Sequence, residues 1–345
     1  MIPIEFFLVF AAILFVIGLY GMLTSRKGLV ILMCIELMLN AANINFITFS
    51  AYGMGTMGQI FVIMSIAVAA AEDGSVLKSI KAAMQQGLVS PVLVGNKSEI
   101  ERIAQLIDFD LSQVEIIHND NGANESAKIA VSEIKKGNAG ILMKGLVSTG
   151  DLLKAVLDKE NGLRKAAILS HVAFFESPYY HKLLCVTDAA MNIAPDLETK
   201  VHILNNAVEA CHKLGITVPK VTVAAAVETV NPKMEATVHA AQLKEMNINK
   251  QLQGCLVDGP FAVDIAVDKE AATHKGIFSE VAGDSDIILV PDIEAGNIFY
   301  KALNFLGGAV CAAVIMGAAV PIVLTSRSDL EISKMLSIVL AAAMD

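Results

Sequence analysis

Charged side chains are sparse at the front of the chain and ordinarily spaced after it, and this break constrains the fold more than any other feature. Before residue 72 the acidic and basic side chains are Glu5, Arg26, Lys27 and Glu36, and Glu72 marks the boundary. This part raises the mean hydropathy of the whole chain to +0.58. An almost uncharged stretch cannot supply the surface of a water-soluble domain, so the sequence predicts two parts of different kinds.

Two apolar runs in the first part have the length of membrane helices. Residues 4–23 form one run of about 20 residues, and residues 29–49 form a second run after an interrupting Ser-Arg-Lys-Gly turn. The first run lacks the basic leading segment of a signal peptide. We therefore predict an apolar helical segment over residues 1–60, with two membrane-type helices and a membrane association through residues 1–58.

The second run carries a polar stripe. Glu36, Asn40 and Asn43 are three or four residues apart and would share one helix face. A carboxylate within a membrane helix is costly and is by default functional. Glu36 therefore suits a proton path, with an interhelical hydrogen bond as the alternative.

The pieces GLVILMCIELMLNAANINFITFS (28–50) and GQIFVIMSIAVAAAE (58–72) resemble the K subunit of the proton-pumping NADH-quinone oxidoreductase. The resemblance implies that Glu36 and Glu72 belong to a proton-translocating path. It stops at Asp73, where the third apolar run has only about 14 residues and is too short to span a membrane. A complete K subunit is therefore not expected.

From Asp73 onward, short apolar runs alternate with amphipathic helical segments. This alternation is typical of a mostly parallel α/β sheet that is covered by helices on both faces. Residues 64–71 could continue a membrane helix or open this sheet, and we predict a strand because the larger domain needs its first strand. Further strands are predicted at residues 91–95, 139–145, 182–188, 220–228, 252–260, 286–292, 312–317 and 321–327.

Charge and cysteine spacing exclude several classes of function. The net charge of −9 argues against nucleic-acid binding, which needs a basic face. The five cysteines form no C-x-x-C pair, so neither a metal site nor a disulfide framework is predicted, and isolated thiols fit the cytoplasm. Residues 73–345 also lack the two common glycine-rich nucleotide-binding patterns.

Polar clusters follow several predicted strands, and ligands of α/β sheets bind at such strand ends. The amino-acid sequences of these segments resemble those of the phosphate acetyl/butyryltransferase family, and more closely those of its butyryl branch. The resemblance covers about residues 66–345 and is carried by MKGLVSTGDLLKAVL (143–157), LSHVAFFE (169–176), ETVNPKM (228–234), GCLVDGPFAVDIA (254–266), residues 274–303 and PIVLTSRSD (321–329).

This resemblance implies a two-domain α/β fold of the isocitrate-dehydrogenase type, with parallel-rich sheets and a central cleft. Domain I would comprise residues 61–163 and 311–345, and domain II residues 164–310. It also implies the reaction acyl-CoA + phosphate ⇌ acyl phosphate + CoA, of the butyryl type. Acyl-CoA and inorganic phosphate would be substrates, with no permanently bound cofactor and no metal. A homo-oligomer is expected.

The chemistry needs a cation for phosphate, donors for the thioester oxyanion and a proton for the leaving thiolate. The resemblance implies that Ser326 forms a hydrogen bond to the intermediate or to the thiol, and that Arg327 binds phosphate. The acetyl branch has its aspartate at the position of Ser333, so we predict Asp329 as the base, with Glu331 as the alternative. Predicted substrate-binding residues are Lys144, His171, Asn297, Tyr300 and Lys301.

Two other functions are weighed against this one. A metal- and nicotinamide-dependent dehydrogenase of the isocitrate type would share the fold but would need a cluster of aspartates for its cation. A membrane subunit of NADH-quinone oxidoreductase would explain only the N-terminal fifth of the chain. The sequence thus predicts a fusion of a cytoplasmic acyltransferase to a piece of membrane protein.

Overall fold

A computed structural model of the chain describes residues 4–24, 34, 38, 41, 64–325 and 330–344. The chain divides into two compact units, Met1–Met64 and Ser65–Asp345. The first contains helix α1 (Ile4–Thr24), which confirms a helix in the first apolar run. Among the described residues, no helix is long and apolar enough to cross a membrane, so the membrane-type character predicted here is not supported.

Small residues let α1 pack closely against its described neighbours. A Cβ added to Gly18 would lie 2.6 Å from Cγ of Met38 and 2.8 Å from the carbonyl oxygen of Cys34. Ala11 and Ala41 are buried in the same unit. Most of the second predicted run, Glu36 included, lies outside the described residues.

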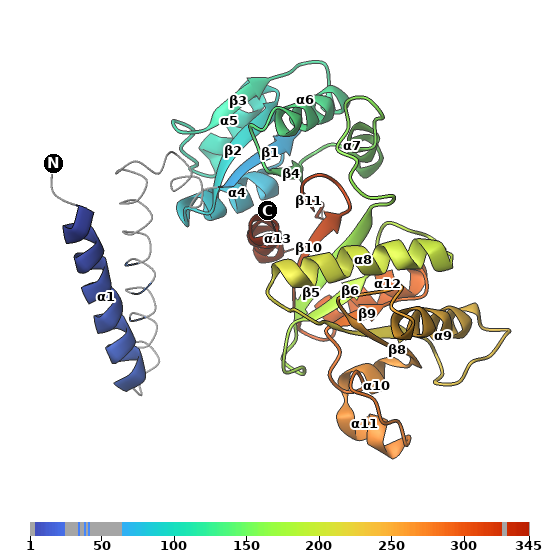
Figure 1. Cartoon of the computed structure of the whole chain (residues 1–345). Helices are drawn as coiled ribbons and strands as arrows, with labels where there is room; N and C mark the ends of the chain where they lie inside the picture. The colour runs from blue at the N-terminus through green and yellow to red at the C-terminus, as the bar shows by residue number, and fades with distance from the viewer. Residues whose placement is uncertain are drawn as a thin grey trace. The chain divides into compact units, whose positions relative to one another are not determined.

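The second unit is built on one sheet of eleven strands in the order β3-β2-β1-β4-β11-β10-β5-β6-β9-β7-β8 (Figure 1). Parallel pairing joins β1 to β4, β4 to β11, β2 to β3, β6 to β9, and β7 to both β8 and β9. Antiparallel pairing joins β10 to β11, β10 to β5, and β5 to β6. The strands are β1 (Met64–Ala69), β2 (Val89–Gly95), β3 (Glu115–His118), β4 (Ile141–Lys144), β5 (Ser170–Glu176), β6 (Leu184–Thr187), β7 (Lys220–Ala224), β8 (Leu256–Phe261), β9 (Ile287–Leu289), β10 (Val310–Met316) and β11 (Ile322–Val323).

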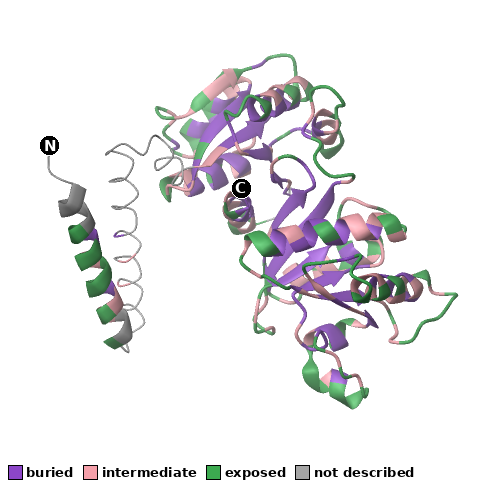
Figure 2. Cartoon of the chain, viewed as in Figure 1, coloured by how far each residue is buried: buried purple, intermediate pink, exposed green. Residues whose placement is uncertain are grey.

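Helices fill most connections between the strands, as expected for a parallel-rich sheet. Figure 2 shows the buried residues concentrated along the strands and on the sides of the helices that pack on them. The helices of this unit are α4 (Gly74–Gln85), α5 (Lys97–Leu106), α6 (Ala123–Lys135), α7 (Thr149–Val156), α8 (Leu197–Lys213), α9 (Glu235–Ile248), α10 (Val263–Val267), α11 (Lys269–His274), α12 (Ile293–Phe305) and α13 (Glu331–Ala343).

The junction between the two parts of the chain, which the sequence allows to be a membrane helix or a strand, forms strand β1 of the sheet. It lies between β2 and β4, and Ile66, Ala67, Val68 and Ala69 are all 0% exposed. Side chains of successive strand residues point to opposite faces, so both faces of the sheet are covered here. The predicted strand over residues 64–71 is therefore confirmed.

All eight other predicted strands are confirmed, with shifted ends. The sequence analysis did not predict β3 or β5 as strands. β3 is short, and its residues are only partly buried. β5 has the sequence SHVAFFE, which the sequence analysis interprets as part of a family motif and not as a strand. The division of this unit into two domains at residues 164 and 310 stays a prediction.

Candidate functional site

Three neighbouring parallel strands, β1, β4 and β11, end at the same edge of the sheet. The chain after β4 runs directly over the end of β1, since Gly145 N–H donates to the Ala69 carbonyl at 2.9 Å and Leu146 N–H to the Ala70 carbonyl at 2.7 Å. A Cβ on Gly145 would lie 2.0 Å from the Ala70 oxygen, so only glycine permits this approach. The loops after β1 and β4 are thereby fixed side by side.

Helices α4, α7 and α13 each begin shortly after one of these three strands. Asp73 caps α4 by accepting from Ser75 N–H at 2.8 Å and Val76 N–H at 3.0 Å. Ser148 caps α7 by accepting from Asp151 N–H at 3.1 Å. The N-cap of α13 is Leu330, whose side chain cannot accept a hydrogen bond. Backbone N–H groups and the helix dipole make such N-termini favourable places for anions.

Lys144 is the last residue of β4 and stands at this edge, as predicted from its position after an apolar strand. It is half-buried, and its Nζ donates to the Gly145 carbonyl at 3.2 Å. Lys144 precedes Thr149, the first residue of α7, by five positions in the sequence. We call the edge formed by the ends of β1, β4 and β11 the strand-end site.

The three predicted catalytic residues, Ser326, Arg327 and Asp329, lie outside the described residues. In sequence they fall between Thr325, which is buried just after β11, and the start of α13. Glu331, the alternative base, is exposed and forms an ion pair with Lys78 of α4 at 3.0 Å.

A second group of predicted residues meets between β5 and α12. The His171 and Tyr300 rings are edge to face with centroids 5.7 Å apart, and Phe175 meets Tyr300 in the same way at 5.3 Å. His171 is 5% exposed, and its backbone carbonyl accepts from the Thr187 hydroxyl at 2.8 Å. Tyr300 thus packs in the apolar core while remaining in contact with an imidazole.

The start of α12 lies close to the end of β6. Asp292 caps the helix by accepting from Ala295 N–H at 2.8 Å. A Cβ on Gly296 would meet the Asp188 carbonyl oxygen at 2.8 Å, so glycine permits this contact. Asn297 Nδ2 is 3.5 Å from the Ala189 carbonyl, and Lys301 is exposed one turn further on.

Sequence reasoning missed the buried carboxylate of Asp188. It is 2% exposed and accepts from three backbone N–H groups, those of Ala190, Met191 and Asn192, and from Asn192 Nδ2 at 2.6 Å. Asp188 directly follows the strand residues LCVT, so the rule that polar residues at strand ends are functional could have singled it out.

The structure does not bring all predicted residues into one cluster. His171 lies opposite Ile315, Ile315 opposite Ile322, and Ile322 opposite Leu142. Three strand spacings separate His171 from β4, or about 14 Å, and Lys144 lies two residues further along that strand. The β5–α12 group and the strand-end site are therefore separate places on the sheet.

The two carboxylates that the sequence assigns to a membrane segment, Glu36 and Glu72, differ in what the structure describes of them. Glu36 lies outside the described residues. Glu72 belongs to the loop after β1, where its carboxylate accepts from Asn96 N–H and lies against Gly95. It therefore joins the ends of β1 and β2 in the sheet rather than extending a membrane helix.

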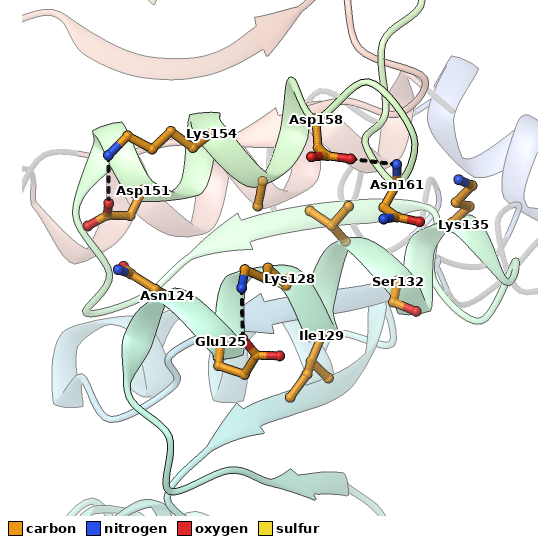
Figure 3. A pocket seen from close by; sticks show the side chains of 12 residues that line it. Asn124, Glu125, Lys128, Ile129, Ser132, Lys135, Asp151, Lys154, Asp158 and Asn161 are labelled. Carbon is orange, nitrogen blue, oxygen red and sulfur yellow. Dashed lines mark hydrogen bonds and ion pairs between the residues drawn. The ribbon is translucent and has the colours of Figure 1, made fainter.

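A surface groove lies away from these residues. A cavity of about 770 Å³ runs between α6 and α7 and is lined by charged residues of both helices (Figure 3). Two of its lysines form ion pairs within their own helices: Lys128 with Glu125 at 3.0 Å and Lys154 with Asp151 at 3.5 Å. None of the predicted site residues lines it, so it is not the candidate site. Among the described residues, no group of three or more His, Cys, Asp and Glu side chains could hold a metal ion.

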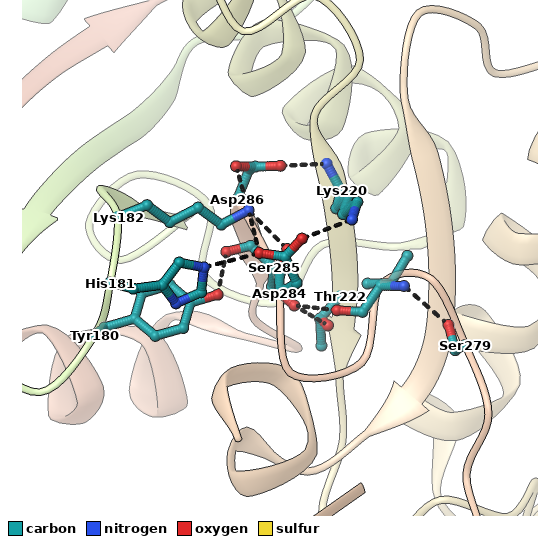
Figure 4. Close-up of polar contacts among 10 residues, drawn as sticks. Tyr180, His181, Lys182, Lys220, Thr222, Ser279, Asp284, Ser285 and Asp286 are labelled. Carbon is teal, nitrogen blue, oxygen red and sulfur yellow. Dashed lines mark hydrogen bonds and ion pairs between the residues drawn. The ribbon is translucent and has the colours of Figure 1, made fainter. Parts of the chain in front are cut away.

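A polar cluster ties the β5–β6 hairpin to the starts of β7 and β9 (Figure 4). Asp284 pairs with His181 at 2.9 Å, Lys182 at 2.9 Å and Lys220 at 2.6 Å. Lys182 also pairs with Asp286 at 2.8 Å. Burial raises the pKa of Asp284, but hydrogen bonds from Lys220, Lys182 and His181 outweigh it and hold this pKa below its ordinary value. The charges of Lys182 and Lys220 compensate those of Asp284 and Asp286, so we interpret the cluster as a structural contact between these segments.

Comparison with known proteins identifies the family of the chain. Residues 63–128 and 122–342 match the phosphate acetyl/butaryl transferase family. The chain belongs to this family. The match includes the strand-end site, β5, β6 and α12, so both groups of predicted residues lie within the family's sequence.

Individual relatives agree. The chain is 50% identical over 277 residues to a probable phosphate butyryltransferase of Bacillus subtilis, covering 80% of this chain and 92% of that one. It is 44% identical to a phosphate acetyltransferase of Thermotoga maritima, covering 80% and 94%. The crystal structure of a branched-chain phosphotransacylase from Enterococcus faecalis superposes with a TM-score of 0.74 at 34% identity, covering 82% and 99%.

The N-terminal resemblance is found as well. Residues 6–86 match the family of NADH-ubiquinone/plastoquinone oxidoreductase chain 4L. This match overlaps the transferase match between residues 63 and 86, where the structure has β1 and α4. The overlapping residues therefore fold as part of the transferase sheet.

Proposed function

We propose that the chain transfers an acyl group between coenzyme A and inorganic phosphate, with butyryl-type acyl groups preferred. The observation that carries the proposal is the 50% identity, over nearly the whole length of the relative, to a probable phosphate butyryltransferase. The strand-end site supports it, because its three strands lead into helix N-termini and Lys144 is the last residue of one of these strands. A doubly charged phosphate needs such neutralisation before one of its oxygens can attack a thioester.

The reaction forms one bond and breaks one. A phosphate oxygen bonds to the thioester carbonyl carbon, and the carbon–sulfur bond then breaks to leave the CoA thiolate, which takes a proton. In this scheme Arg327 binds phosphate oxygens in pairs, and Ser326 donates a hydrogen bond to the reacting group. Asp329 acts as the general acid or base that exchanges a proton with the CoA thiol. Lys144 and the start of α7 stabilise phosphate charge, while His171, Asn297, Tyr300 and Lys301 contact the acyl-CoA.

Several finer features belong to the same proposal. The unit Ser65–Asp345 would act as two domains with the substrates in a cleft between them, as a homo-oligomer and without a permanently bound cofactor. Membrane association through residues 1–58 and a cytoplasmic location are predictions from sequence, and the transfer reaction depends on neither.

Acyl selectivity tests the butyryl assignment. Phosphate-dependent release of CoA would be measured for acetyl-, propionyl-, butyryl- and isobutyryl-CoA, with arsenate replacing phosphate in a parallel series. Each methylene is worth about 10-fold or more in a fitted pocket, so kcat/KM should be highest for a four-carbon group. Highest activity with acetyl-CoA would overturn the butyryl assignment. Activity that required magnesium and a nicotinamide cofactor would instead favour the dehydrogenase alternative.

A further inference from the structure

The loop between β4 and α7 leaves one large apolar side chain uncovered at the strand-end site. Leu146 is 49% exposed, whereas Gly145 before it and Val147 after it are buried. Val147 packs in the core cluster that also contains Ala70, and this cluster does not include Leu146. The backbone of the loop is therefore anchored, while the leucine side chain stays outside this core.

The backbone of Leu146 is held by a residue in a strained conformation. The Leu146 N–H donates to the Ala70 carbonyl at 2.7 Å. Ala70 is 1% exposed and has a φ of +57°, in the left-handed region that residues with a Cβ rarely adopt. Such conformations are costly and gather at functional sites, where the surrounding structure maintains them. The strained turn at the end of β1 therefore marks the backbone of Leu146 as part of the site.

The neighbours of Leu146 in the loop decide what its side chain can do, since a single exposed leucine is ordinary on a protein surface. Lys144 lies two residues before it, and Ser148, the N-cap of α7, lies two residues after it. Consecutive Cα atoms are about 3.8 Å apart, so the Cα of Leu146 lies within about 7.6 Å of each of the other two. One short loop thus carries a cation, an apolar side chain and a helix N-terminus, which favours anions.

The start of α13 adds uncovered apolar side chains at the same edge of the sheet. Leu330, the N-cap of this helix, and Ile332 in its first turn are 69% and 46% exposed. Helix α13 follows β11, and β11 pairs with β4. Large uncovered apolar side chains at a site that also has polar groups indicate contact with an apolar part of a ligand.

We propose that Leu146 contacts the acyl chain of the substrate and thereby favours longer acyl groups over acetyl. The inference rests on the proposed function and adds the residue that selects the acyl group. In an acyl phosphate, one carbonyl carbon joins the apolar chain to the phosphate, so a chain beside bound phosphate needs an apolar neighbour. Leu146 is the uncovered leucine of the loop in which Lys144 and the start of α7 are proposed to stabilise phosphate.

Steady-state kinetics of Leu146→Ala with acetyl-, propionyl- and butyryl-CoA, at saturating phosphate, test the proposal. The quantity compared is the ratio of kcat/KM for butyryl-CoA to kcat/KM for acetyl-CoA. Each methylene in a fitted pocket is worth about 10-fold or more, so this ratio should fall about 10-fold or more in the variant. Propionyl-CoA should lie between the two, and kcat/KM for acetyl-CoA should change little, because the acetyl chain has only a methyl group.

Two control variants separate the lost contact from a general disturbance. Leu146→Met keeps the volume and apolar character of the side chain and should retain the wild-type ratio. Leu106→Ala removes another exposed leucine, 73% exposed at the last residue of α5, and should also retain it. The midpoint of thermal unfolding would check that Leu146→Ala is folded.

The outcomes distinguish this inference from the proposed function itself. An unchanged or increased ratio in Leu146→Ala would overturn the inference. An equal loss for all three substrates would overturn it too, because it would place Leu146 against the pantetheine arm that every acyl-CoA shares. A wild-type chain that released no CoA from any of the three with phosphate present would overturn the proposed function, and this inference with it.

Discussion

Single residues at strand ends show what local sequence can and cannot reveal. Lys144 was predicted to stand at a strand end because an apolar run precedes it, and the structure has it there. Asp188 also directly follows an apolar strand, but it belongs to none of the family motifs, so the motifs alone do not mark it. The contact of Lys200 with His239, at 3.0 Å between Nζ and Nδ1, joins two helices 39 residues apart and leaves no local pattern in the sequence.

Arg327 is the residue whose substitution should affect phosphate most directly. Arg327→Lys keeps the charge but loses paired hydrogen bonding, worth about 1.5–3 kcal/mol for a charged pair, so KM for phosphate should rise about 10-fold or more. KM for acyl-CoA should change little. Arg102→Lys is the matched control, because Arg102 forms an exposed pair with Glu99 on α5. Unchanged phosphate kinetics in Arg327→Ala would contradict the assignment.

The choice of base is decided by comparing two neighbouring carboxylates. Asp329→Asn should lower kcat by about 10²-fold or more with little change in KM, as expected for loss of a general acid or base. Glu331→Gln should be mild, because Glu331 is exposed and already paired with Lys78. Steady-state kinetics in both directions of the reaction give the answer. If Glu331→Gln is the crippling change, the base has been misassigned.

At the scale of elements, the buried contact between α8 and α9 should make stability depend on pH. Lys200 and His239 are 3% and 8% exposed. Burial lowers the pKa of both groups, and Lys200 lowers that of His239 further, against the opposing effects of Glu235 and Asp196. Asp292 is the other carboxylate that acts on Lys200.

The sign of this effect follows from linkage. Because the pKa of His239 is lower in the folded chain than its ordinary value of 6.5, the unfolded chain binds the proton first as pH falls. Stability from this group is complete above pH 6.5 and is lost below it, with a slope of at most about 1.4 kcal/mol per pH unit. Denaturant unfolding of His239→Gln between pH 5 and pH 7.5 should show a flatter dependence than wild type. His274→Gln, at an exposed imidazole, is the control, and an equal slope in His239→Gln and wild type would refute the effect.

Strand β1 decides how much of the N-terminus the transferase needs. Deleting residues 1–58 should leave an active enzyme, because the sheet begins at Met64. Deleting residues 1–74 should abolish folding, because it removes a strand from between β2 and β4. Burial of Ile66 and Val68 alone contributes about 1.5–3 kcal/mol each. Expression yield and specific activity of both deletions check this, and an active enzyme that lacks residues 1–74 would show that β1 is dispensable.

At the scale of the whole molecule, the sequence predicted the elements better than their arrangement. Continuous apolar runs such as residues 91–95 and 312–317 indicated buried strands, and the junction strand followed from the needs of the sheet. No local sequence pattern predicts that β10 and β5 pair antiparallel in the middle of an otherwise mostly parallel sheet. That pairing joins residues about 140 apart in sequence, and it separates Lys144 from His171, which a list of motifs could not reveal.

The central claim is that an acyl group passes from coenzyme A to phosphate, and the most direct measurement is the stoichiometry of the two products. The purified full chain would be incubated with butyryl-CoA and inorganic phosphate, with free thiol followed by absorbance and acyl phosphate by phosphorus NMR. The account predicts one butyryl phosphate for each CoA released, and no release without phosphate. Release of CoA without phosphate, or without acyl phosphate as product, would contradict it.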